Sequence, residues 1–120
     1  IFWHACGLGE SDPHLVEHFG MTTVEAMQNY CVPAVIDGGG QKEIVEHGVS
    51  GYRFSTLEEL QSFTMEVVLD PGKRREVAAK AYARSHRFNF DVFKKQVAKM
   101  FQDIENELAG SEYALKDSKG

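Results

Sequence analysis

Short apolar runs along the chain alternate with longer segments in which apolar residues recur every three or four positions. Three runs predict buried strands, because each is short, apolar and bounded by turn residues; they are IFWHA at 1–5, PAVID at 33–37 and YRF at 52–54. The other segments predict helices at about 22–30, in QKEIVEH before Gly48, and at 57–69, 71–85 and from about 89 onward. Strands alternating with helices in this way predict an α/β fold, with a parallel sheet covered by helices on both faces.

Two helix starts carry clear capping signals. Ser55 with Glu58, and Thr56 with Glu59, are overlapping candidates for a capping box, and Asp70 before Pro71 is a cap followed by proline at the first helical position. The last helix has an amphipathic stripe that we interpret as core, formed by Phe93, Val97, Met100, Phe101, Ile104 and Leu108. From Gly110 the chain is polar and aperiodic, so we expect a domain over 1–109 and a disordered tail over 110–120.

Composition excludes some classes of protein. The 120 residues suit one domain or most of one, and a net charge of −5 argues against non-specific binding to nucleic acid or to an anionic membrane. No apolar stretch reaches membrane-spanning length. Cys6 and Cys31 form no CxxC motif, so we expect reduced, buried thiols in a cytoplasmic protein. The chain opens inside an apolar run at Ile1, which we interpret as a cut within a longer protein.

The segment EHFGMTTVE, from Glu17 to Glu25, is the strongest candidate for a binding site. Two carboxylates that can accept hydroxyl groups flank a run of backbone amides over 19–22 that can hold an anion. A sugar nucleotide has the complementary pattern of polyol, diphosphate and ribose diol. Ligands of parallel sheets bind at the carboxyl ends of strands, so we expect the loops 6–21 and 38–40 to converge on one crevice.

Each of these residues also has a purely structural interpretation. Thr22 as N-cap would make Glu25 the partner in a capping box, Glu17 would be a solvated loop acid, and water would hydrate the helix start. The glycines at 38–40 fit either a close approach to a phosphate or a tight turn. His4 fits a satisfied core histidine or a substrate contact, and Glu43 a first-turn acid facing the helix dipole.

The spacing of the candidate residues does not indicate a metal site or a covalent nucleophile. No histidine pair has metal-ligand spacing with a nearby cysteine or acid, and there is no DxD motif for a metal diphosphate. There is also no GxSxG motif or Cys-His arrangement for a covalent nucleophile. We therefore expect neither a metal nor a cofactor.

EHFGMTTVEAM, followed by PAVIDGGGQKEIVEHGVSGYRF, resembles the C-terminal domain of retaining glycosyltransferases of family 4, also called group 1. The matching pattern is a glutamate, seven residues and a second glutamate, then a strand, a glycine pair, a glutamate and a Gly-turn-Gly. It covers about 1–55 with specific motifs and continues through the less specific helices to about 108. The resemblance implies a Rossmann-like domain that forms the C-terminal half of a two-domain, GT-B type enzyme.

The resemblance also implies roles for residues of this chain. Glu17 would be the catalytic-site glutamate that contacts donor hexose hydroxyls, and Glu25 would hold the ribose diol. The backbone amides expected to contact the hexose and phosphate are those of Phe19, Gly20, Met21 and Thr22. Possible further cleft contacts are His4, Gly39 and Gly40.

By the same resemblance, the parent enzyme transfers a hexose from a nucleoside diphosphate sugar, with retention and without a metal, to a glycan or lipid-linked acceptor. Polysaccharide synthesis at the inner face of a membrane is the expected setting. The family's basic diphosphate-binding pair and the acceptor domain would lie before Ile1, so we expect this chain alone to be inactive. A non-catalytic sugar-nucleotide-binding module, an epimerase of the same fold and a plain structural domain remain alternatives. The base, the sugar and the acceptor stay open.

Overall fold

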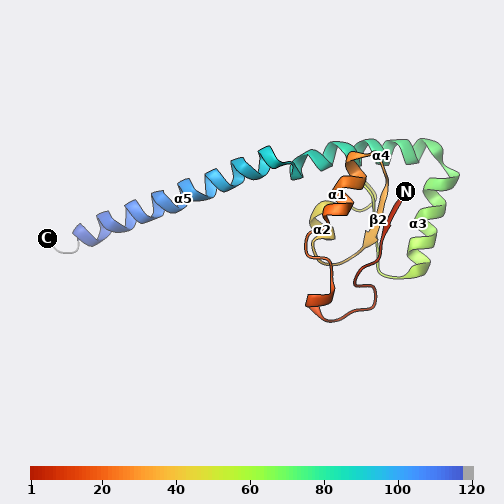
Figure 1. Ribbon diagram of the computed structural model, residues 1–120, viewed down its shortest axis with the longest axis horizontal. Helices are drawn as coiled ribbons and strands as arrows, with labels where there is room; N and C mark the ends of the chain where they lie inside the picture. The colour runs from red at the N-terminus through yellow and green to blue at the C-terminus, as the bar shows by residue number, and fades with distance from the viewer. Residues whose placement is uncertain (118–120) are drawn as a thin grey trace. The chain divides into compact units, whose positions relative to one another are not determined.

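The computed structural model describes residues 1–117, apart from the side chains of Pro13 and of residues 110–117 (Figure 1). The chain divides into two compact units, Ile1–Arg87 and a second unit that begins at Phe88. The first unit contains all three predicted strands and the Glu17–Glu25 segment. Residues 118–120, the end of the expected tail, lie outside the described part.

The sheet has three strands, which are parallel, as the sequence predicts, and their order in the sheet is β1-β2-β3. These strands are β1 (Phe2–His4), β2 (Pro33–Ile36) and β3 (Tyr52–Phe54). Every residue of β2 is buried, because β2 is the middle strand and has helices on both sides. A buried middle strand also explains why PAVI is apolar throughout instead of alternating.

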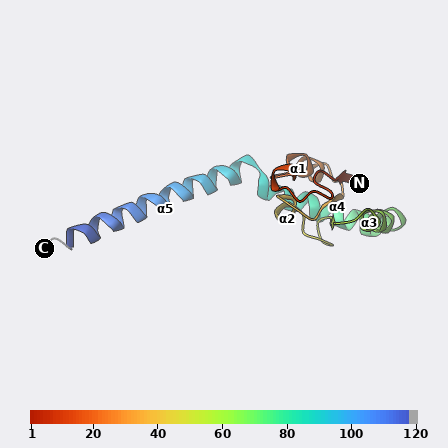
Figure 2. The ribbon, with the colours of Figure 1, turned by 90° about the horizontal axis from the view of Figure 1, so that it is seen from below.

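Helices α1 (Met21–Gln28) and α3 (Leu57–Leu69) contact the sheet, α1 at β1 and β2, and α3 at β2 and β3. Both ribbon views show these two helices well apart (Figure 2), with β2 between them in Figure 1. Helix α4 (Pro71–Ser85) packs against both α1 and α3. This unit also contains the 3-10 helix η1 (Pro13–Leu15) and the short helix α2 (Gln41–Ile44), and a second 3-10 helix, η2 (His86–Phe88), spans the boundary between the units in the sequence.

The predicted caps of α3 and α4 are present. Thr56 Oγ1 accepts a hydrogen bond from Glu59 N at 3.2 Å, and the Glu59 carboxylate accepts one from Ser55 N at 2.7 Å. Asp70 Oδ1 accepts from Lys73 N at 2.9 Å ahead of the first turn of α4. These local bonds satisfy amides that the helices cannot, which is why both starts were predictable from sequence.

Helix α2 ends at Ile44, four residues before the predicted stop at Gly48. Arg84 of α4 explains the early end: its Nε donates to Ile44 O at 2.6 Å and its Nη2 to Glu43 O at 2.7 Å. These carbonyls would otherwise need amides from a further helical turn. A side chain forty residues away thus ends the helix, and the local sequence carries no sign of it.

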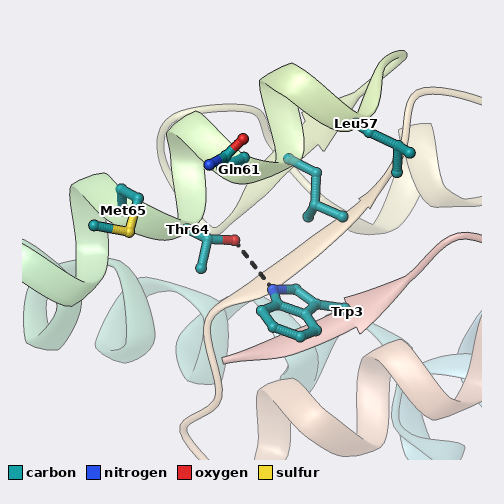
Figure 3. Close-up of a pocket in the computed structure, with 6 residues that line it drawn as sticks. Trp3, Leu57, Gln61, Thr64 and Met65 are labelled. Atoms are coloured by element: carbon teal, nitrogen blue, oxygen red, sulfur yellow. Dashed lines mark hydrogen bonds between the residues drawn. The ribbon is translucent and has the colours of Figure 1, made fainter.

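Strand β1 is at one edge of the sheet, and its Trp3 side chain is 61% exposed. Trp3 lies beside α3, where its Nε1 donates to Thr64 Oγ1 at 3.1 Å (Figure 3). A hollow of about 260 Å³ surrounds this contact, with Leu57, Leu60 and Met65 on its apolar wall. The sheet face over β1 is therefore only partly covered by the described residues.

The second unit consists mainly of helix α5 (Phe90–Asp117), whose start is capped by Asn89 Oδ1 accepting from Val92 N at 2.8 Å. The predicted apolar stripe is present on this helix, but the interpretation as core is wrong for the described structure, since Phe93 is 58% and Leu108 62% exposed. Periodicity shows that a face is apolar but not what covers it. The backbone of α5 continues through the expected tail to Asp117, so the boundary at 109/110 stays a prediction.

Among the described residues, no helix is both long and apolar enough to span a membrane.

Candidate functional site

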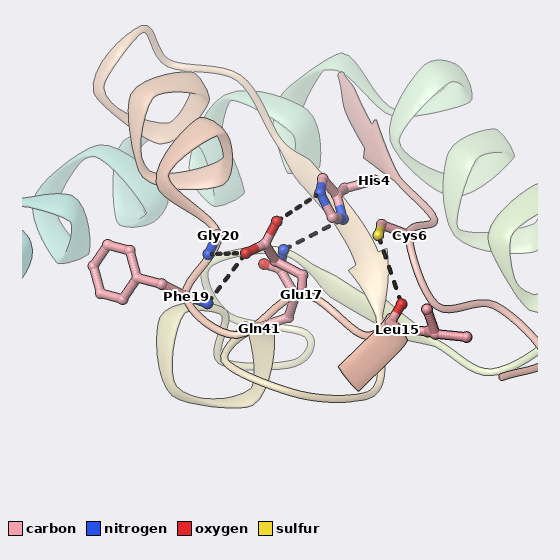
Figure 4. Close-up of polar contacts among 7 residues, drawn as sticks. All are labelled: His4, Cys6, Leu15, Glu17, Phe19, Gly20 and Gln41. Atoms are coloured by element: carbon pink, nitrogen blue, oxygen red, sulfur yellow. Dashed lines mark hydrogen bonds and ion pairs between the residues drawn. The ribbon is translucent and has the colours of Figure 1, made fainter. Parts of the chain in front are cut away.

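The two loops predicted to converge lie against each other at the carboxyl ends of β1 and β2. The loop after β1 passes through Glu17 to α1, and the loop after β2 contains the three glycines. Gly40 N donates to Glu17 O at 3.0 Å, which joins the loops directly. Figure 4 shows Glu17 at the centre of the resulting group of polar contacts.

The glycine pair is required by this loop-to-loop contact. A Cβ on Gly39 would overlap the carbonyl oxygen of Glu17, and one on Gly40 would overlap that of His18. Gly39 also has a φ of 52°, a conformation that favours glycine. Gly38, by contrast, has open space where a Cβ would lie. Gly39 and Gly40 therefore shape the site by letting the Glu17 loop approach, and in this structure the close approach is to protein backbone.

The Glu17 carboxylate is oriented by its own loop. Its Oε1 accepts hydrogen bonds from Phe19 N at 3.2 Å and Gly20 N at 3.1 Å. These two bonds, chiefly, hold the pKa of Glu17 below its ordinary value of 4.5; burial opposes them weakly, and His4 and His18 add smaller favourable contributions. Glu17 is thus an ionised acceptor at neutral pH. The amides of Phe19 and Gly20, expected to contact the ligand, are engaged by this carboxylate.

Helix α1 begins two residues earlier than the capping-box interpretation requires. Gly20 is the N-cap, with a φ of 85° and no side-chain cap, so the prediction of Thr22 as N-cap is wrong. The reason is that Gly20 alone adopts this left-handed conformation at no steric cost. No acceptor among the described residues takes the amides of Met21 and Thr22, so these two N–H groups are open to an anion at the positive end of the helix.

The structure does not give Glu25 the capping role that was the alternative to ligand binding. It lies beyond the first turn of α1, its carboxylate has no hydrogen-bond or ion-pair partner among the described residues, and its side chain is exposed. It follows Met21 by four residues, which places both on one side of the helix. Glu25 and the open amides are therefore neighbours on the surface of α1. Glu43, in contrast, occupies the first turn of α2, as the structural interpretation predicts.

His4 and Gln41 complete the group. His4, at the end of β1, has Nε2 3.7 Å from Glu17 Oε2 and Nδ1 3.4 Å from Gln41 Nε2. The sequence indicated His4 but not Gln41, which is fully buried at the start of α2. Position 41 directly follows the glycine pair, and a polar residue there is the one signal that could have drawn attention to it.

The structure also bears on the cysteines, on metal ligands and on other hollows of the surface. Cys6 is exposed and Cys31 is half-buried, so the expectation of two buried thiols is wrong; the Cys6 Sγ contacts Leu15 O at 3.9 Å, and both cysteines are free. The described residues contain no cluster of three or more metal-ligating side chains. Two further hollows do not include Glu17 or Glu25. One, of about 440 Å³, is lined in part by Arg74 and Arg75, and the other, of about 260 Å³, is lined in part by Asp37 and Arg53.

Comparison with known proteins identifies the family. Residues 10–84, more than half of the chain, match the family "Glycosyl transferases group 1". Among curated proteins none matches.

Solved structures show the same fold. The chain is similar to a crystal structure of Anabaena Alr3699/HepE in complex with UDP (TM-score 0.69, 29% identity), covering 84% of this chain and 27% of that one. It is also similar to the HepE complex with UDP-glucose (TM-score 0.62, 30% identity, 72% of this chain and 25% of that one). The C-terminal domain of LpcC, a group 1 family protein from Francisella tularensis, matches at a TM-score of 0.55 and 19% identity, over 75% and 45% of the two chains. The α/β architecture expected for part of a GT-B type glycosyltransferase is confirmed.

Proposed function

Because the chain belongs to the group 1 glycosyltransferases, we propose that its first unit is the donor-binding part of a retaining hexosyltransferase. The enzyme would transfer a hexose from a nucleoside diphosphate sugar to a glycan or lipid-linked acceptor. The observation that carries the proposal is the start of α1, where a carboxylate and two open amides, each without a protein partner among the described residues, lie side by side.

Each part of the donor finds a complementary group at this site. The Glu25 carboxylate accepts the two ribose hydroxyls, and such charge-assisted bonds contribute about 1.5–3 kcal/mol. The amides of Met21 and Thr22 face the diphosphate at the helix N-terminus. Glu17 accepts hexose hydroxyls through Oε2, since Phe19 and Gly20 already occupy Oε1 and fix the orientation of the carboxylate.

In the transfer step, negative charge builds up on the departing diphosphate. Open amides and the helix dipole stabilise that charge without reorganising, because they are already directed outward. We expect the anomeric configuration to be retained and no metal to be required. Added EDTA should then leave the transfer rate of the complete enzyme unchanged, whereas a rate restored only by Mg²⁺ or Mn²⁺ would contradict this part.

The donor is proposed to carry uridine diphosphate. The HepE structures contain UDP and UDP-glucose, and this chain is 29–30% identical to them. Since the chain spans about a quarter of their length, the acceptor site and the cations for the diphosphate are assigned to the remainder of the enzyme.

The proposal is tested by ligand-observed NMR of this chain with UDP, GDP, ADP and their glucose forms, in the wild type and in Glu25→Ala. We predict that UDP and UDP-glucose bind, and that the variant weakens both about tenfold or more, the factor that a loss of about 1.4 kcal/mol gives. Stability should change by less than about 0.5 kcal/mol, because Glu25 is exposed and unpaired.

Glu58→Ala is the matched control, since Glu58 is an exposed helical glutamate of α3, outside the site. Binding unchanged in Glu25→Ala, together with a stability loss of about 1 kcal/mol as removal of a cap gives, would overturn the proposal in favour of a structural glutamate.

A further inference from the structure

Gln41 is a polar side chain with no solvent exposure, placed between β1 and the Glu17 loop. Its amide lies directly under Gly20, where a Cβ would come within 2.8 Å of Gln41 Nε2. The Oε1 atom is buried and has no hydrogen-bond partner among the described residues. A buried polar atom that has no hydrogen-bond partner destabilises the folded chain. An apolar side chain would avoid that cost, so the presence of an amide at this buried position needs an explanation.

The contact of Gln41 with His4 explains the buried amide. The two ring nitrogens of His4 face different groups: Nε2 lies 3.7 Å from Glu17 Oε2, an ion-pair distance, and Nδ1 lies 3.4 Å from Gln41 Nε2. A carboxylate only accepts hydrogen bonds and an amide nitrogen only donates them. The neutral imidazole that satisfies both neighbours has its proton on Nε2 and its lone pair on Nδ1. The opposite tautomer would set lone pair against carboxylate and N–H against N–H.

We propose that Gln41 is a positioning residue that holds His4 in the Nε2–H tautomer. The site then presents an N–H donor beside the Glu17 carboxylate acceptor. A sugar hydroxyl both donates and accepts, so a single hydroxyl beside these two groups can donate to the Glu17 carboxylate and accept from His4 Nε2–H. With the opposite tautomer, both groups would be acceptors and the hydroxyl oxygen would have no donor. The role toward the sugar rests on the proposed function, whereas the tautomer does not.

The test uses this chain labelled with ¹⁵N in its imidazole rings. Long-range ¹H–¹⁵N spectra at about pH 8.5, where an ordinary imidazole is neutral, report which nitrogen carries the proton. We predict the Nε2–H form for His4 in the wild type and a mixture in Gln41→Met, which keeps the unbranched shape but removes the donor. Gln28→Met, at an exposed position of α1, should leave the spectrum unchanged.

An Nδ1–H form in the wild type would overturn the inference even if Gln41→Met failed to fold, and so would an unchanged tautomer in a folded Gln41→Met. The link to the sugar is read from binding: Gln41→Met should weaken UDP-glucose about three- to tenfold and UDP less, for loss of one hydrogen-bonded contact. Equal losses for both ligands, or none, would overturn that link. Absence of all nucleotide binding by the wild type would instead overturn the proposed function and leave the tautomer result standing.

Discussion

Glu17 carries its charge because its own loop solvates it. Two backbone amides bind one carboxylate oxygen and are the main cause of its lowered pKa, to which His4 and His18 make smaller contributions. This arrangement fixes the carboxylate before any ligand arrives, and preorganised acceptors of this kind lose less entropy on binding. The same bonds couple the charge of Glu17 to folding.

The pH dependence of stability should reveal this coupling. Because the pKa of Glu17 is lower in the folded chain than its ordinary value of 4.5, the stability it contributes is present above that value and is lost as pH falls through the folded pKa. We predict that Glu17→Gln flattens the fall in unfolding free energy below pH 4.5, measured by denaturant titration. Glu10→Gln, in the same loop, is the control, and an equal slope in Glu17→Gln and wild type would contradict the assignment.

Sequence reasoning indicated most residues of the candidate site, but neither Gln41 nor the bonds among them. The spacing of Glu17 and Glu25 and the amide run between them were sufficient to place the candidate site. The choice between Thr22 and Gly20 as N-cap depended on backbone conformation, because a left-handed glycine and a threonine side chain can both begin a helix. The Gln41 contact with His4 joins residues 37 positions apart, and a single sequence does not show such a pairing.

At the scale of elements, the site depends on how closely two loops can approach. The glycine pair after β2 lies against the Glu17–His18 backbone, and the Gly40 amide bonds the Glu17 carbonyl. Helix α2, which follows, is short and is held at its end by Arg84. The position of the Glu17 loop is thus fixed by β2, α2 and α4 together.

Gly40→Ala should disrupt this contact. The new Cβ would overlap the His18 carbonyl while φ at Gly40, −66°, stays ordinary, so the effect isolates steric overlap from backbone strain. We predict a loss of about 1–3 kcal/mol in unfolding free energy, typical of overpacking, and weaker UDP-glucose binding. Gly38→Ala, with open space at its Cβ, should change neither quantity by a comparable amount. Equal effects of the two substitutions would show that the loop contact is unimportant.

Element boundaries were predictable wherever local chemistry sets them. Thr56, Glu59 and Asp70 cap α3 and α4 through bonds within four residues, and the predicted starts at 57 and 71 are confirmed. The end of α2 was not predictable, because Arg84 sets it from a distant part of the chain. The parallel direction of the strands followed from their alternation with helices, whereas their order in the sheet was not predicted.

At the scale of the whole molecule, the described residues leave apolar surfaces exposed in each of the two units. Trp3 and its hollow lie at the edge of the sheet in the first unit, and the apolar stripe of α5 is exposed in the second. The hydrophobic pattern alone predicted that the stripe is apolar, but the burial of a surface depends on what packs against it. The chain spans about a quarter of the HepE structures it resembles.

We therefore predict that this chain binds donor but does not transfer sugar by itself. Transfer requires an acceptor held in line with the donor, and the roles that we propose for residues of this chain concern the donor alone. The measurement is hydrolysis or transfer of radiolabelled UDP-glucose by the purified chain over many hours, with the complete enzyme as the positive control. A turnover rate of the purified chain that exceeds the rate of its Glu17→Gln variant would contradict this division of roles.

Titration of the ¹⁵N-labelled chain with UDP-glucose, followed by backbone ¹H–¹⁵N correlation spectra, would show which residues of this chain contact the donor. We predict that the largest shifts occur at Met21, Thr22 and Glu25 and spread into the Glu17 loop. Shifts that instead cluster around Arg74 and Arg75, in the largest of the described hollows, would contradict the assignment of the start of α1 as the donor site.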